Sequence, residues 1–342
     1  MQVLLRDDLD RRAVDLDPVI HVRGLVKRYG PIEAVAGIDL DVHRGEIFGF
    51  LGPNGAGKST TISILCTLVG ATAGTATVAG HDVAREPHAV RRSIGLIFQD
   101  PSLDDQLTAR ENLRFHALVY GVPRAERRRR IEELLRTVDL VERAGSPVRT
   151  FSGGMRRRLE IARGILHAPE VLFLDEPTQG LDPQTRASIW EHLQRLRRER
   201  GLTMFMTTHY MDEAEWCDRI AIIDHGRIVA LGTPEELKAR VGGDVVTLST
   251  DDDARAATEI TERLGVTPSP APGGLLIEVA DGAAFVPTLI GMLSVRTRSV
   301  TVRRPSLDDV FLKLTGHAIR DEQADAQEAL RRMATRWQGG RR

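Results

Sequence analysis

The fold is decided by one stretch, Gly52-Pro-Asn-Gly-Ala-Gly57-Lys58-Ser59, which fits the phosphate-binding pattern G-x-x-x-x-G-K-[ST]. The short apolar run Glu46–Leu51 precedes it, and apolar residues recur at helical spacing from Ser59 to Val69. The local order is therefore strand, glycine-rich loop and helix, which is the context that the pattern requires. Glycines let backbone N–H groups converge on one point, and the positive end of the helix faces the same point. This stretch predicts a polyphosphate site.

Two side chains in this loop suit particular parts of a bound nucleotide. The Lys58 ammonium can reach the β- and γ-phosphates as a point charge, and the Ser59 hydroxyl is a suitable Mg²⁺ ligand. The alternative interpretation is a structural glycine-rich turn, although a chance match to the pattern has odds of only roughly 1 in 250. We therefore expect nucleotide contacts from Gly52, Pro53, Asn54, Gly55, Ala56, Gly57, Lys58, Ser59 and Thr60.

A second motif, Val171-Leu-Phe-Leu-Asp175-Glu176, is an apolar strand that ends in two carboxylates. Ligands of open α/β sheets bind at the carboxyl ends of the strands, where both acidic side chains are expected to lie. Asp175 is the expected Mg²⁺ ligand, directly or through water, and Glu176 is the expected base that deprotonates the attacking water. An acidic turn after a strand is common, so this prediction depends on its pairing with the Lys58 loop.

Strands and helices alternate through most of the first 240 residues. Helical stretches such as Pro183–Glu199 separate four short apolar runs. These runs are Ile94–Phe98, Val171–Leu174, Thr203–Thr207 and Arg219–Ile223. The alternation predicts an α/β fold with a mainly parallel sheet and helices on both faces. Residues 20–29 and 38–42 instead alternate apolar with polar side chains, which predicts antiparallel edge strands.

The pattern between Asp100 and Thr150 is helical only. The sequence Thr108-Ala-Arg-Glu111 fits a capping box that opens one helix, and Pro123 stands near the start of a second, charged helix. We expect a helical subdomain, at about residues 100–155, inserted into the α/β core.

The C-terminal part has a different order. Residues 244–315 run as strand, helix, strand, helix, strand and short helix, with a proline-rich loop at 267–274, which predicts a small α+β domain. The expected organisation is an N-terminal tail at 1–18, the main domain at 19–240, the accessory domain at 241–316 and a tail at 317–342.

Composition disfavours several classes of protein. The 342 residues contain 47 Lys and Arg against 48 Asp and Glu, with 42% hydrophobic and 28% charged residues. A disordered chain, a collagen-like fibre and a strongly basic nucleic-acid binder are therefore disfavoured. No run approaches the roughly 18 apolar residues of a membrane span, and residues 1–12 are charged where a secretory signal is apolar. We therefore expect that the chain itself is neither secreted nor membrane-spanning. Its two cysteines are too few for a disulfide framework.

A third motif, Phe151-Ser152-Gly153-Gly154-Met155, precedes a helix that begins with the arginines 156–158. Its serine and glycines lie at a second positive helix end, and the arginines are interpreted as a cover of the helix surface or an addition to the phosphate field. Together with the first two motifs, this order resembles the ATP-binding cassette (ABC) ATPases. The resemblance covers about residues 19–240. It implies a P-loop NTPase fold, a RecA-like parallel sheet core with an antiparallel β edge and a helical subdomain.

The remaining motifs of that family are present in order. By resemblance, Gln99 is the Q-loop residue, with roles in catalysis and Mg²⁺ binding, and His209 is the catalytic switch histidine. Asp182, in Gly180-Leu-Asp182, belongs to the D-loop at the nucleotide, and Tyr29 stands where the family stacks an aromatic ring on adenine. The alternative interpretation of Tyr29, Gln99 and His209 is a structural role in packing or at a strand end.

The resemblance also implies a head-to-tail homodimer. In such a dimer, ATP held by Lys58 of one subunit is completed by Ser152, Gly153 and Gly154 of the other. A physical argument agrees, because one chain does not need two anion cradles for one phosphate. The first and fifth signature residues, Phe151 and Met155, depart from the usual Leu and Gln, but the Ser-Gly-Gly core is intact and we expect active sites.

Two further segments, residues 100–113 and 303–312, resemble the ATPase subunits of bacterial daunorubicin-resistance-type exporters, the ABC-2 class. The resemblance implies a two-component exporter that uses ATP and Mg²⁺. In it, this chain is a peripheral ATPase at the cytoplasmic face of the membrane. A separate membrane permease, docked near Gln99–Asn112, moves a drug-like or lipophilic substrate.

Two other functions fit the sequence less well. A soluble ABC ATPase that acts on ribosomes or nucleic acid commonly has two cassettes or long insertions. This chain has one cassette and a near-neutral charge, so we expect no nucleic-acid partner. A regulatory module that binds without turnover is the other alternative, but the expected catalytic residues are all present. The arginine tract 127–130 is interpreted as a solvated helix face.

Overall fold

The computed structural model describes residues 18–100, 102–240, 242–271 and 273–315. The chain divides into two compact units, with the division between Leu231 and Gly232. The two expected tails lie outside the described residues, except for Pro18. Within the described part of the chain, no helix has both the length and the apolar character that crossing a bilayer needs.

The first unit is organised by a six-stranded sheet with the strand order β10-β9-β3-β8-β7-β6. The strands are β3 (Ile47–Leu51), β6 (Ile94–Ile97), β7 (Val171–Asp175), β8 (Thr203–Thr208), β9 (Arg219–Asp224) and β10 (Arg227–Gly232). The pairs β3·β8, β3·β9, β6·β7 and β7·β8 are all parallel. All residues of β3 and β8 are buried, as expected for strands covered on both faces. The predicted parallel core is confirmed.

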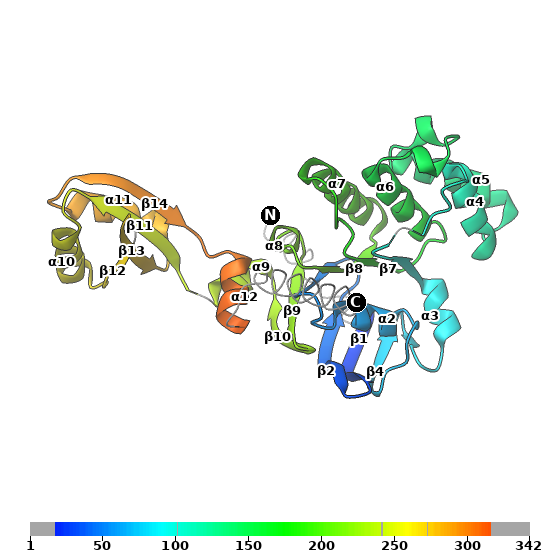
Figure 1. The fold of residues 1–342 in the computed structure, drawn as a ribbon, viewed down its shortest axis with the longest axis horizontal. Helices are drawn as coiled ribbons and strands as arrows, with labels where there is room; N and C mark the ends of the chain where they lie inside the picture. Colours follow the sequence, from blue (N-terminus) through cyan, green and yellow to red (C-terminus); the bar gives the residue numbers. More distant parts are fainter. Residues whose placement is uncertain (1–17, 101, 241, 272, 316–342) are drawn as a thin grey trace, which may run out of the picture. The chain divides into compact units, whose positions relative to one another are not determined.

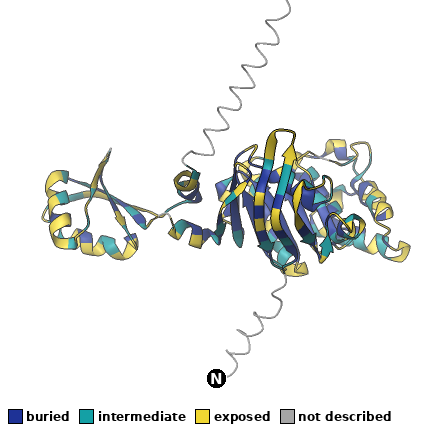
Figure 2. Ribbon diagram, turned by 90° about the horizontal axis from the view of Figure 1, so that it is seen from below, coloured by how far each residue is buried: buried dark blue, intermediate teal, exposed yellow. Residues whose placement is uncertain are grey.

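A second, four-stranded antiparallel sheet packs against one face of this core. It has the order β2-β1-β4-β5, formed by β1 (Ile20–Tyr29), β2 (Ile32–Val42), β4 (Ala73–Val78) and β5 (His81–Asp82). Helix α2 (Lys58–Leu65) contacts β2, β4 and β7, and so connects the two sheets. One hydrophobic cluster joins Val22 and Ile38 of this sheet to Phe50, Phe173 and Phe205 of the parallel sheet. The buried residues follow the strands between exposed outer helix faces (Figure 2).

Helices α4 (Ala109–Val119) and α5 (Arg124–Thr137) lie within the predicted helical insertion at about residues 100–155, and α6 (Gly153–Gly164) begins at its end. The first unit also contains α3 (Pro87–Ser93), α7 (Pro183–Arg200) and α8 (Met211–Ala214). Helices α6 and α7 lie on the side of β7 and β8 that faces away from α2 (Figure 1). The predicted capping box at Thr108 is present, with both of its hydrogen bonds to Glu111.

The second unit contains a four-stranded antiparallel sheet of order β12-β13-β11-β14. Its elements are α9 (Pro234–Ala239), β11 (Asp244–Thr250), α10 (Asp253–Leu264), β12 (Ser269–Ala271), β13 (Gly274–Val279), α11 (Gly282–Met292), β14 (Thr297–Arg303) and α12 (Leu307–Thr315). A cluster of Val246, Leu248, Ile260, Ile277 and Leu289 packs α10 and α11 on the sheet. The expected loop at 267–274 was partly wrong, because β12 forms there as an edge strand, where a proline is tolerated.

Gly95 of β6 allows a very close approach between the sheet and helix α6. A Cβ atom on Gly95 would lie 2.2 Å from the carbonyl oxygen of Gly164 and 2.9 Å from Leu172 Cδ1. Backbone atoms cannot move away as a flexible side chain can, so this position has no room for any larger residue.

We therefore expect Gly95→Ala to lower the free energy of unfolding by about 1–3 kcal/mol, the usual cost of overpacking. Urea unfolding of the purified chain, followed by circular dichroism, measures this change. Gly70→Ala is the matched control, because a Cβ at Gly70 meets nothing within 4 Å. Equal unfolding midpoints for the two variants would show that β6 and α6 are not in this contact.

Candidate active site

The phosphate loop connects β3 to α2, as the sequence predicts. Gly57 is the N-terminal flanking residue of α2 and has a left-handed backbone with φ of 105°. A Cβ on Gly57 would lie 2.3 Å from the carbonyl oxygen of Ala34, and one on Gly52 would lie 2.3 Å from that of Ile223. Only glycine fits at these two positions. The loop is therefore held between β2 and β9 with its N–H groups at the end of the sheet.

Lys58 lies inside this loop with its charge almost fully buried, at 4% exposure. Its Nζ donates hydrogen bonds to the carbonyl oxygens of Gly52 at 2.8 Å and Pro53 at 2.9 Å. It also lies 3.4 Å from Oε1 of Glu176. A buried ammonium is costly unless it is paired and hydrogen-bonded, and these three oxygens supply both requirements.

Ser59 and Asp175 meet at the first turn of α2. The Ser59 hydroxyl donates to Oδ1 of Asp175 at 3.2 Å, and the Thr207 hydroxyl donates to the same oxygen at 2.5 Å. Hydroxyl and carboxylate oxygens are the hard donors that Mg²⁺ prefers. This donor set therefore fits Mg²⁺ beside the phosphate loop.

Glu176 is buried directly after β7, with a strained backbone. Its φ of 44° lies in the left-handed region, which is uncommon for a residue with a side chain. Its Oε2 lies 3.3 Å from Nδ1 of His209, and neither atom has another hydrogen-bond partner among the described residues. Burial alone would raise the pKa of Glu176, but His209 and the Lys58 ammonium outweigh it, so its pKa lies below the ordinary value. The side chain is an ionised proton acceptor at neutral pH.

These groups line one open hollow of about 330 Å³ at the end of the parallel sheet. Eight of the predicted residues line it: Asn54, Gly55, Gly57, Lys58, Ser59, Thr60, Gln99 and Glu176. Ala34 and Gln179 complete the wall. Gly52, Pro53 and Ala56 belong to the loop behind it, and Asp175 and His209 contact the wall residues Ser59 and Glu176. The structure thus brings together the first two predicted motifs.

The third motif, Phe151–Met155, lies at the start of α6, and its Ser152 and Gly154 are not part of the lining of the Lys58 hollow. Ser152 is an exposed residue that flanks the start of α6 and accepts a hydrogen bond from the Met155 N–H at 3.3 Å. Gly154 is buried against Thr185, and Gly153 lines a neighbouring hollow that shares Gln99, Glu176 and Gln179 with the first. Neither Ser152 nor Gly154 lines the Lys58 hollow.

Two other predicted nucleotide residues also lie outside the lining of that hollow. Tyr29 ends β1, is partly exposed and has the Lys27 ammonium 4.8 Å from its ring centre. Asp182 flanks the start of α7, where it accepts hydrogen bonds from Thr185 N at 3.0 Å and Oγ1 at 2.6 Å. The roles of Tyr29 and Asp182 at the nucleotide stay predictions.

Arg157 is a supporting residue whose position the sequence interpretation missed. It is only 6% exposed, so the interpretation of arginines 156–158 as a surface cover is wrong for this residue. Its guanidinium pairs with Glu160 at 2.9 Å and donates to the carbonyl oxygens of Phe98 at 2.7 Å and Glu176 at 3.3 Å. Arg157 stands on α6, the helix that Ser152 precedes. From there it holds the backbone beside Gln99 and the backbone of Glu176 in place. An arginine run gives no signal of which member is buried.

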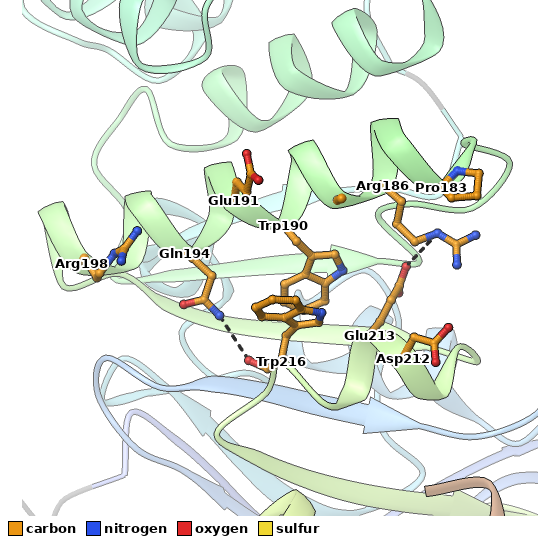
Figure 3. Close-up of a pocket in the computed structure, with 10 residues that line it drawn as sticks. Pro183, Arg186, Trp190, Glu191, Gln194, Arg198, Asp212, Glu213 and Trp216 are labelled. Carbon is orange, nitrogen blue, oxygen red and sulfur yellow. Dashed lines mark hydrogen bonds and ion pairs between the residues drawn. The ribbon is translucent and has the colours of Figure 1, made fainter. Parts of the chain in front are cut away.

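A larger hollow of about 490 Å³ lies between α7 and α8, beside two parallel tryptophans, Trp190 and Trp216 (Figure 3). Arg186 points from α7 toward Glu213, 3.7 Å away. Glu213 is buried and accepts a hydrogen bond at 2.7 Å from the hydroxyl of Thr208, the residue before His209. This hollow shares no lining residue with the phosphate site. The two are connected through Glu213, which lines this hollow and is hydrogen-bonded to the residue before His209.

Two families match the chain. The ABC transporter family matches residues 35–179, and the family of the ATP-binding protein DrrA1-3-like, C-terminal domain, matches residues 232–315. Daunorubicin resistance ATP-binding protein DrrA3 of Streptomyces coeruleorubidus is 43% identical over 90% of this chain and 99% of its own length. Linearmycin resistance ATP-binding protein LnrL of Bacillus subtilis is 39% identical over 89% of this chain and all of its own length.

Solved structures agree with these relatives. An ATP-binding subunit of an ABC transporter is 33% identical over 65% of this chain and 92% of its own, with a TM-score of 0.59. A dimeric ATP-binding cassette in a post-hydrolysis state, bound to ADP and Pi, is 29% identical over 63% of this chain and 98% of its own, with a TM-score of 0.57. These findings confirm the predicted P-loop NTPase fold and the resemblance on which it rests. The chain belongs to the ATP-binding proteins of ABC transporters, which are ATPases, and carries a DrrA1-3-like C-terminal domain.

Proposed function

We propose that two copies of this chain form a head-to-tail homodimer with two shared ATP sites. In each site, the Lys58 loop of one copy binds the phosphates and the Ser152–Gly154 tip of the other completes the cradle. The observation that carries this proposal is the position of Ser152. It is exposed at a positive helix end, yet it does not line the Lys58 hollow of its own chain. The similarity to dimeric cassettes supports the same arrangement.

Within each site, the chain's own groups divide the work of hydrolysis. The Lys58 ammonium stabilises phosphate charge from a dry, preorganised position. Glu176, ionised and buried, accepts the proton of the attacking water, and His209 fixes the orientation of its carboxylate. Ser59, Asp175 and Gln99 would hold Mg²⁺, whose charge supplies further stabilisation of the phosphates. Tyr29 stacks on the adenine ring and Asp182 contacts the nucleotide from the loop before α7.

We further propose that hydrolysis drives export through a separate membrane permease, with this chain held peripherally at the cytoplasmic face of the membrane. Relatives named for daunorubicin resistance and linearmycin resistance support a drug-like or lipophilic substrate. The permease docks near Gln99–Asn112. Phe98, directly before Gln99, is 41% exposed, as expected for an apolar side chain that a partner covers. No relative described above supports the alternative of a ribosome or nucleic-acid partner.

The role of Glu176 predicts the behaviour of Glu176→Gln. We expect the steady-state ATPase rate to fall about 100-fold to 10,000-fold, the usual contribution of general base catalysis, while ATP binding persists. A coupled phosphate-release assay and an ATP titration measure the two quantities. Glu170→Gln removes an exposed carboxylate elsewhere and should keep the wild-type rate. An undiminished rate in Glu176→Gln would exclude this carboxylate as the base.

The shared site predicts complementation between two inactive variants. Lys58→Ala removes the phosphate-binding ammonium. Ser152→Asp keeps a side chain suited to start α6 but places a negative charge where the partner's phosphate is expected. We expect each variant alone to be inactive, and their mixture to regain part of the activity, because each mixed dimer has one site with intact Lys58 and Ser152. The measurement is ATPase activity of an equimolar mixture against each variant alone.

Ser152→Asn is the control for this experiment, since it starts the helix as well as Asp but adds no charge. It should remain active. An inactive mixture, obtained with folded variants that still exchange subunits, would indicate that each site uses both motifs from a single chain.

The permease proposal predicts co-purification. Tagged wild-type chain, extracted from membranes in a mild detergent, should bring down an integral membrane protein, and Phe98→Ser should weaken this association because it removes apolar contact area. Val229→Ser is the matched control, since Val229 is exposed to a similar extent, 38%, but lies on β10. Recovery of ribosomal proteins or nucleic acid in place of a membrane protein would contradict the exporter proposal.

A further inference from the structure

A basic groove of about 560 Å³ lies between α4 and α5 in the helical insertion. Its lining consists of five arginines, one isoleucine and one carboxylate: Arg110, Arg114, Arg124, Arg127, Arg128, Ile131 and Glu132. The phosphate site uses none of these arginines, and only Arg110 lies within the expected permease segment Gln99–Asn112. The whole chain has a formal charge of −1, so this concentration of positive charge is local.

Most of the positive charge in the groove is not neutralised within the described part of the chain. Arg110 pairs with Glu132 at 3.0 Å, and Arg127 donates its Nε hydrogen to the carbonyl oxygen of Val122 at 2.7 Å. Arg124 and Arg128 make no hydrogen bond or ion pair with the described residues, and both are exposed. Other arginines of α5 differ in this respect, since Arg129 pairs with Glu133 and Arg130 with Glu126. None of the arginines 127–130 is buried, which agrees with the expected solvated helix face, but the groove leaves the charge of Arg128 without an acidic partner among the described residues.

The start of α5 adds to the same field. Pro123 flanks the helix, and no side chain caps its first N–H groups. The positive end of the fourteen-residue helix therefore lies beside Arg124, Arg127 and Arg128. Guanidinium groups around a positive helix end are suited to a phosphate group, which they can bind through paired N–H donors.

Exposed apolar side chains adjoin the arginines on α4. Leu118 follows Arg114 by four residues and so lies next to it on the helix surface, with 51% exposure. Phe115 precedes Leu118 by three residues, about one helical turn, and is 63% exposed. This combination is suited to a membrane surface, because the cation binds lipid phosphates while the apolar side chain enters the headgroup region.

We propose that this groove binds the headgroups of anionic phospholipids and holds the helical insertion on the membrane surface. The proposal deepens the peripheral membrane location and rests on it. The five arginines supply the charge complementarity, and Leu118 with Phe115 favours a lipid surface over a soluble phosphate compound or a nucleic acid. The site would act together with the permease contact, because α4 begins within the expected docking segment.

Sedimentation of the full chain with lipid vesicles tests the proposal without the permease. One set of vesicles is pure phosphatidylcholine and the other contains 30 mol% phosphatidylglycerol, at about 0.1 M salt, where the screening length is about 10 Å. We expect binding to the anionic vesicles only. Arg124→Gln with Arg128→Gln should weaken it about 30-fold, since each arginine near such a surface contributes about fivefold.

The matched control is Arg129→Gln with Arg136→Gln, which removes the same charge from the same helix but outside the groove lining. It should bind almost as the wild type does. Phe115→Ser with Leu118→Ser should weaken binding in salt that screens the arginines, because apolar contact is not screened.

Three results would overturn the proposal: equal losses in the groove and control variants, equal binding to both kinds of vesicle, or displacement by millimolar glycerol phosphate. The last result would assign the groove to a soluble phosphate compound. ATPase activity of the same preparations separates this test from the proposed function. Groove variants should hydrolyse ATP at the wild-type rate, whereas failure of the ATPase proposal would show in the Glu176 and Lys58 variants.

Discussion

A buried positive charge, the Lys58 ammonium, is the constraint on which the rest of the site depends. Such a charge persists in a protein interior only when oxygens surround it, and here two loop carbonyls and the Glu176 carboxylate do so. The loop carbonyls are available because Gly52 and Gly57 let the backbone pass within contact of β9 and β2. A triphosphate offers the same ammonium stronger acceptors, so binding can release Glu176 for its proposed role as base.

Arg157 connects the site to helix α6. Arg157 binds backbone oxygens beside both Gln99 and Glu176, and it stands on α6, which Ser152 opens. A shift of α6 would therefore also displace the backbone of Glu176, the proposed base. In the proposed dimer, Ser152 of one copy contacts the nucleotide of the other. Arg157 would then connect that contact to Glu176 of the copy that carries Ser152.

Much of the first unit could be predicted from sequence because its signals are local. The strands β3, β7, β8 and β9 each contain a short apolar stretch, and the pattern at Gly52–Ser59 demands a particular backbone. The capping box at Thr108 is likewise a local device, and it forms as predicted. The parts that sequence reasoning missed depend on tertiary contacts. Arg157 is indistinguishable from its neighbours in an arginine run, and Gln179 meets Gln99 only because the folded sheet brings their strands together. Strand β12 contains Pro270 and exists only through its pairing with β13.

The central claim is that two copies of the chain share each nucleotide. The most direct measurement is a crystal or electron-microscopy structure of Glu176→Gln trapped with ATP and Mg²⁺. The account predicts that the γ-phosphate lies within hydrogen-bond distance of Lys58 from one copy and of Ser152 and Gly154 from the other. A γ-phosphate bound by Lys58 alone, or by both elements of a single copy, would contradict it.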